Sequence, residues 1–165
     1  MFVFDHGAAS YNPLELTDSR RLVLGRDAGS HGTFEQRWND VHNRSSTGLE
    51  IGVAGRGVYR HREGNHRIDE TLTLGVLTGG RGEYELSELE GGWSALDTWE
   101  TVVGGAGQGL FSHSGGLHET ERLLVGNEAG SDGQYRQQGG HALTWELILG
   151  YQAGSRGRFE WTGGT

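Results

Sequence analysis

LILGYQAGSRGRF, residues 147–159, reads as a short apolar run, a glycine-rich turn and an aromatic residue. The same phrase occurs six times in the 165-residue chain. The other copies begin at Leu22, Leu49, Leu72, Thr101 and Leu123. The glycines that close the apolar tripeptides are separated by 27, 23, 29, 22 and 24 residues. A period of about 25 residues, kept over most of a chain, predicts a repeat architecture.

The apolar tripeptide of each copy predicts a short β-strand whose first and third residues point to the same side. We expect these two positions to form two columns that build the core. The first column is Leu22, Leu49, Leu72, Thr101, Leu123 and Leu147. The second column is Leu24, Ile51, Leu74, Val103, Val125 and Leu149.

A second predicted strand begins near the aromatic residue of each copy. Its expected column is Phe4, Phe34, Tyr59, Tyr84, Phe111, Tyr135 and Phe159. The column two residues later is His6, Gln36, His61, Leu86, His113, Gln137 and Trp161. A third, variable segment leads into the next tripeptide, and its expected inward anchors are Ile68, Leu96, Leu117 and Leu143.

The glycine-rich turn that joins the first two strands suits a backbone with positive φ and close stacking, where a Cβ would clash. A β-branched residue in place of Gly52 or Gly126 is therefore expected to cost more stability than an ordinary surface substitution.

Three strands and three turns in about 25 residues match one coil, or rung, of a β-solenoid. We therefore predict an all-β, three-faced β-solenoid of about six rungs. It forms a single domain over residues 1–165, with a partial N-terminal rung at 1–21 and the repeats at 22–165. The alternative is a closed toroidal repeat such as a β-trefoil-like or β-prism-like fold, because the first copies of successive pairs lie 50 and 51 residues apart.

Composition narrows the classes of partner. The net charge of −8 disfavours nucleic acid and anionic membranes, because binding to phosphates needs clustered positive charge. The chain contains no cysteine, so it has neither disulfides nor thiolate metal ligands. No stretch approaches the ~20 apolar residues of a membrane-spanning helix. The first ten residues, MFVFDHGAAS, lack the basic and apolar regions of a signal peptide.

Several copies resemble a known type of repeat. LVLGRDAGSHGTF (22–34), LLVGNEAGSDGQYRQQGG (123–140) and LILGYQAGSRGRFEWTGG (147–164) resemble the LxLGxxAGSxGTYxLxGG units of exported bacterial proteins with autotransporter-like β-strand repeats. VVGGAGQGLFSHSGG (102–116) resembles their shorter unit, VGxxGxGxFxQSGG. The resemblance implies a right-handed β-solenoid, extracellular or at the cell surface, that acts as a stalk, adhesive or scaffold. The third segments here are richer in Arg, Glu and His than those of the family.

The histidines do not predict a metal site. His61 and His113 occupy equivalent positions two rungs apart, at roughly 10 Å. That separation is too long for one shared zinc ion, whose bonds to nitrogen are about 2 Å. We therefore interpret the histidines as surface or stacked residues. The GGRGEY stretch at 79–84 has glutamate where a calcium-binding nonapeptide has aspartate and does not recur every nine residues, so no cofactor or metal is predicted.

Two carboxylate pairs are candidates for glycoside chemistry, which uses two carboxyl groups roughly 5–10 Å apart. Glu119/Glu121 and Asp69/Glu70 both lie in the variable third segment. No rung carries a cluster that interrupts the repeat, so we interpret these side chains as a solvated face and predict no catalytic residues.

The five tryptophans are Trp38, Trp93, Trp99, Trp145 and Trp161. Trp99 and Trp145 each precede an apolar tripeptide by two residues, which predicts that they pack into the interior, since burial of an indole removes a large apolar area from water. The alternative is a line of aromatics that stacks on sugars.

The leading functional hypothesis is a non-enzymatic structural or adhesive solenoid, extracellular or on the cell surface. We expect it to stack head to tail into fibres, with the 159–165 rung meeting the 1–16 rung of the next copy. Surface glycans are the second expected class of partner. The alternatives are a carbohydrate-binding or polysaccharide-cleaving β-helix and an engineered repeat scaffold.

Overall fold

The computed structural model describes residues 2–3, 21–45 and 47–165. Within these ranges the chain forms β-strands and no helix. The strands are β1 (Phe2–Val3), β2 (Leu22–Leu24), β3 (His31–Ser45), β4 (Leu49–Ile51), β5 (Arg56–Leu74), β6 (Arg81–Leu86), β7 (Ser94–Val103), β8 (Gln108–His113), β9 (Leu117–Val125), β10 (Asp132–Gln137), β11 (His141–Leu149) and β12 (Arg156–Trp161).

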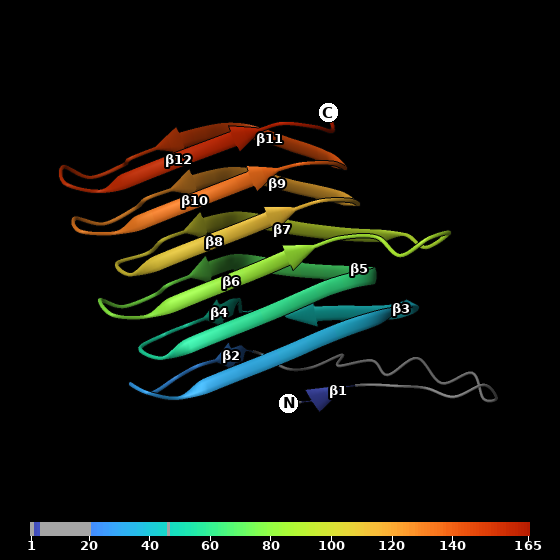
Figure 1. Cartoon of the computed structure of the whole chain (residues 1–165), viewed down its shortest axis with the longest axis horizontal. Coiled ribbons are helices and arrows are strands. Elements are labelled where there is room, and N and C mark those ends of the chain that lie inside the picture. Colours follow the sequence, from blue (N-terminus) through green and yellow to red (C-terminus); the bar gives the residue numbers. More distant parts are fainter. Residues whose placement is uncertain (1, 4–20, 46) are drawn as a thin grey trace.

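The strands stack as the coils of a β-solenoid of about five turns (Figure 1). Each strand pairs in parallel with its counterpart one repeat later, as β6 pairs with β8 and β7 with β9. The long strand β5 joins the two halves of the sheet, whose order runs β11-β9-β7-β5-β6-β8-β10-β12. The two ends of the chain lie at opposite ends of the stack (Figure 1). The fold is the predicted solenoid and not the closed toroid, and the six copies of the phrase delimit its five complete turns.

The third segment and the apolar tripeptide form one continuous strand in β7, β9 and β11. A bend marks the junction of the two segments. In β7, Thr98 and Thr101 both point inward, three residues apart, and their hydroxyl oxygens lie 2.8 Å from each other. Strict alternation would place only one of them inside, so the strand changes phase between them. The three-faced cross-section and the right-handed winding stay predictions.

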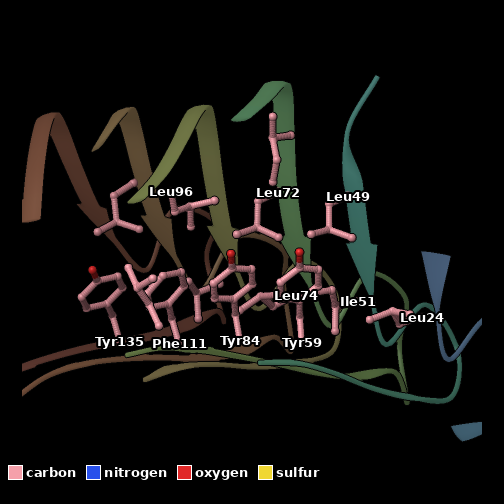
Figure 2. Packing of buried hydrophobic residues seen from close by; sticks show 14 of the residues in the cluster. Leu24, Leu49, Ile51, Tyr59, Leu72, Leu74, Tyr84, Leu96, Phe111 and Tyr135 are labelled. Atoms are coloured by element: carbon pink, nitrogen blue, oxygen red, sulfur yellow. The ribbon is translucent and has the colours of Figure 1, made fainter. Parts of the chain in front are cut away.

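The expected columns build the core. The aromatic residues are stacked along the solenoid, with successive ring centroids 4.7–5.1 Å apart from Phe34 to Phe159. Figure 2 shows part of this row, with the leucine columns facing it across the interior. Leu72 and Leu74 are completely buried. Every rung thus repeats the same layer of apolar side chains on the one before it.

Two predicted core positions are wrong in the third segment. Leu96 is buried and pairs in register with His118, not with Leu117. The neighbouring pairs are Asp97 with Glu119 and, one rung on, Glu119 with Leu143. Because adjacent residues of a strand face opposite sides, this offset leaves Leu117 half-buried and Leu143 52 % exposed.

The inward column that the structure forms at this level is His66, Leu96, His118 and Ala142. At the other end of the stack, the register pairs Phe2 with Phe34, whereas the sequence analysis expected Phe4 to precede Phe34. Phe4 and His6 themselves lie outside the described residues.

The turn after each apolar tripeptide depends on glycine. Gly52 has φ +70°, and a Cβ built on it would collide with the backbone carbonyl of Arg81 in the next rung. Gly126 has φ +77° and meets the carbonyl of Arg156 in the same way. These positions have both of the features expected from the sequence, a left-handed backbone and a rung packed directly against it.

Candidate functional site

Four of the histidines lie inside the solenoid, in two clusters built alike. In the first cluster, His61 and His66 face the same tyrosine hydroxyl, with Nδ1 to Oη distances of 3.0 and 3.4 Å to Tyr84. The His61 Nε2 atom lies 2.8 Å from the carbonyl oxygen of Gly64. Since a carbonyl only accepts, His61 carries its proton on Nε2 and accepts the tyrosine proton at Nδ1.

The second cluster repeats this arrangement two rungs later. His113 and His118 place their Nδ1 atoms 3.1 and 2.9 Å from the Tyr135 hydroxyl. The Nε2 atom of His113 lies 3.1 Å from the carbonyl oxygen of Gly116, so His113 has the same tautomer as His61. Tyr135 then donates to His113 and accepts the Nδ1 proton of His118.

The two clusters differ at one atom. In the second, the Nε2 atom of His118 lies 3.1 Å from the hydroxyl of Thr101 in the preceding rung and accepts its proton. In the first, the Nε2 atom of His66 is buried and has no hydrogen-bond partner among the described side chains. The register places Leu49 in the rung before His66, at the position that Thr101 occupies for His118. A leucine side chain cannot donate a hydrogen bond to the Nε2 atom of His66.

Burial keeps these imidazoles neutral. Removal from water lowers the pKa of His61 to about 4 and that of His118 to about 3. The same cause, with the repulsion that would arise if His61 and His66 were both protonated, holds the pKa of His66 well below its usual value. Burial also raises the pKa of Tyr135. The clusters are enclosed, so their hydrogen bonds stabilise the fold. Their side chains are not accessible to a substrate.

The repeat pattern does not predict the histidine clusters, because His61 and His66 lie in different segments of the repeat. A signal was present in the chain: both pairs are five residues apart, and a tyrosine follows one repeat after the first histidine. His61 and His113 themselves are separated by the rung of Leu86, as their equivalent positions required.

The expected carboxylate pairs lie outside the core. Asp69 forms an ion pair with Arg67 at 3.1 Å, and Glu70 is exposed. Glu119 and Glu121 lie on the outer face of β9, half-buried and exposed respectively. A shallow polar groove of about 410 Å³ crosses the outer face of the aromatic strands between Arg81 and Asp132. Among the described residues, no three histidines or carboxylates gather closely enough to hold a metal ion.

The tryptophan prediction is wrong. Trp99 is 58 % exposed and Trp145 is 74 % exposed, whereas both were expected to pack inside. The phase change between Thr98 and Thr101 explains the difference, because it leaves two consecutive residues, Trp99 and Glu100, on the outer surface. The side chain of Trp38 lies outside the described ones.

The last rung, formed by β11 and β12, exposes residues at positions that the rungs from Leu49 to Leu123 bury. Leu147 and Leu149 are 44 % and 47 % exposed. Each of the two strands pairs on one side only, with β9 and β10 respectively, and they end the strand order of the sheet. The rung therefore presents apolar columns between two strand edges that have no partner strand, although the Ala142 N–H of β11 donates to the carbonyl oxygen of Thr165.

Comparisons with protein-family models, curated proteins and solved structures gave no match. Within the described ranges, no helix is long and apolar enough to cross a lipid bilayer. The geometry offers two candidate functional surfaces. They are the open face of the last rung and the outer face that carries the tryptophans.

Proposed function

We propose that this chain is a non-enzymatic structural solenoid that associates end to end through its last rung. The observation that carries the proposal is the open face of β11 and β12, where Leu147 and Leu149 lie exposed between two edges that have no partner strand. Exposed parallel edges are templates for strand addition, and apolar side chains beside them add a hydrophobic contribution.

The occupant that fits this face best is a rung of the same kind, supplied by a second copy of the chain. Residues 147–159 repeat the phrase of the buried rungs, so their columns match the spacing of leucines and aromatics in any other rung. Phe159 continues the aromatic row with its centroid 4.9 Å from that of Tyr135. A copy added in register would extend that row by a further ring.

Such a contact is heterologous, because it joins two different surfaces of the same protein. A heterologous contact that does not close into a ring produces a filament. The expected product is a rod that grows by whole solenoids. A location outside the cell, and adhesive use of the rod's sides, are supported by the resemblance of the repeats to those of exported bacterial proteins.

Sedimentation velocity over a range of concentrations tests the association. We expect the wild-type chain to gain mass with concentration and the Leu149→Arg variant to sediment as a monomer, because the charge would have to be buried in the interface. Leu77→Arg is the matched control, since Leu77 is 52 % exposed in a turn away from the last rung. A monomeric wild type at high concentration would refute the proposal.

The non-enzymatic part of the proposal has its own test. Incubation with a panel of polysaccharides, followed by measurement of newly released reducing ends, is expected to show no cleavage. Release that depends on Glu119 or Glu121 would assign a hydrolase instead.

A further inference from the structure

The outer face of β7, β9 and β11 carries two exposed indoles in one column. Trp99 lies opposite Glu121 in the neighbouring strand. This follows from the flanking pairs, because Thr98 lies opposite Thr120 and Glu100 lies opposite Arg122. On the other side of β9, Thr144 and Glu146 lie opposite the same two residues, which places Trp145 beside Glu121 as well. The two indoles are therefore two strand spacings apart, at about 10 Å.

Both indoles stand on a fixed backbone. The hydroxyl of Thr120, in the strand between them, donates a 3.0 Å hydrogen bond to the carbonyl of Arg122 and lies 3.5 Å from the carbonyl of Trp99. The Thr98 and Thr101 hydroxyls stabilise the bend from the inside. Neither indole stacks on another ring among the described residues, and both present a large apolar surface to solvent.

Polar groups suited to hydroxyl recognition surround the indoles. Arg122 lies beside the column and forms ion pairs with Glu100 at 3.0 Å and Glu146 at 2.9 Å. Glu121 lies between the two indoles, and Glu119 faces outward two residues before it. Carboxylates accept hydrogen bonds from hydroxyl groups, and a guanidinium donates to hydroxyl oxygens.

We propose that Trp99 and Trp145 form a binding site for a neutral, extended, β-linked polysaccharide that runs along the solenoid axis. A β-linked pyranose chain presents equivalent apolar ring faces at every second sugar, a repeat comparable to two strand spacings. The carboxylates beside the indoles, and the net charge of −8, select against acidic glycans. This site is separate from the face of the last rung, because the indoles point outward from the sheet.

Binding of neutral oligosaccharides to the intact chain tests the site. Isothermal titration with cello-, xylo- and chito-oligosaccharides of increasing length is carried out at concentrations where the chain is monomeric. We expect affinity to rise steeply between the disaccharide and the tetrasaccharide, because about three sugars are needed to reach both indoles. Trp99→Ala and Trp145→Ala should each weaken tetrasaccharide binding about tenfold and remove this step with length.

Trp93→Ala is the matched control, since Trp93 is 47 % exposed but lies outside the column, and its binding should equal that of the wild type. Three results would overturn the proposal: no binding to any neutral oligosaccharide, binding unaffected by both substitutions, or stronger binding to polygalacturonate. Loss of self-association in Trp99→Ala would identify the indole face as a protein interface, and that result would also overturn it. Circular dichroism confirms that each variant is folded.

Discussion

The rung at Leu72 and the rung at Leu147 carry the same phrase in different surroundings. Leu72 and Leu74 are fully buried between the rungs before and after them, whereas Leu147 and Leu149 are nearly half exposed. Their sequences are LTLG and LILG, so composition does not account for the difference. In a solenoid, each rung obtains its burial from its neighbours, and stability is close to a sum of such interfaces. A repeat at the end retains one interface and lacks the other.

The largest contrast between a covered rung and the last rung is expected at the turn glycines, of which Gly52 closes the covered tripeptide at Leu49. Gly52→Val should prevent correct stacking, because the new side chain meets the carbonyl of Arg81 in the next rung. Gly150→Val should be milder, on the order of 1–2 kcal/mol, since its Cβ would lie 3.7 Å from the nearest atoms and only the backbone strain of φ +69° remains. Urea unfolding measures both, and equal losses would show that stacking does not determine the cost.

Acid should destabilise the covered rungs that bury the histidine clusters. The depressed pKa of His61 means that the unfolded chain binds a proton before the folded chain does. Stability is therefore fully present above pH 6.5 and decreases as pH falls to about 4. The pKa difference corresponds to about 3 kcal/mol from His61 alone.

Urea midpoints between pH 8 and pH 4 measure this loss. His61→Gln should flatten the curve, because it removes a buried imidazole whose pKa is lowered to about 4. A curve that is flat in the wild type would contradict the buried, neutral assignment of these imidazoles.

The leucine columns provide a direct comparison of covered and uncovered rungs. Leu74→Ala removes a completely buried side chain and should cost about 2–5 kcal/mol in unfolding free energy. Leu149→Ala, measured on dilute monomer, should cost about 1 kcal/mol or less, since nearly half of that side chain is already in water. Equal losses of unfolding free energy in the two variants would mean that the last rung of the monomer is covered in solution, which would contradict the open face.

The smallest expected effect concerns a buried threonine of a covered rung, Thr101, and an exposed threonine of the last rung, Thr144. Thr101→Val removes the partner of His118 Nε2 and makes the second cluster resemble the first, at a cost of about 1–3 kcal/mol. Thr144→Val alters an exposed hydroxyl that bonds only the carbonyl of Glu146, so it should be nearly neutral. Nitrogen-15 NMR of the imidazoles should show His118 protonated at Nδ1 in the wild type. An Nε2 proton there would contradict the hydrogen-bond assignment.

The sequence predicted the parts of the fold that repeat exactly. The apolar and aromatic columns follow from the alternation of a strand and the period of the repeat, and both hold from Leu49 to Tyr135. The third segment was harder to predict, because loops of different length precede it and a one-residue offset reverses the faces. Because of that offset, Leu117 and Leu143 do not occupy the inward positions expected of them.

The candidate surfaces were less predictable than the core. Alternation counted back from Thr101 placed Trp99 inside, and only the bend between Thr98 and Thr101 reveals that it faces solvent. The histidine clusters likewise depend on which rungs bring His61 and His66 to one tyrosine. Contacts between segments, and not the period itself, determine both features.

The central claim is that the last rung is completed by another copy of the chain, and hydrogen–deuterium exchange tests it most directly. Exchange is measured at several protein concentrations, with peptides covering His141–Leu149 and Arg156–Trp161. We expect amides on the free edges of β11 and β12 to become more protected as concentration rises, while those of β7 and β8 stay equally protected throughout. Protection of β11 and β12 that does not change with concentration, or that appears only elsewhere in the chain, would contradict it.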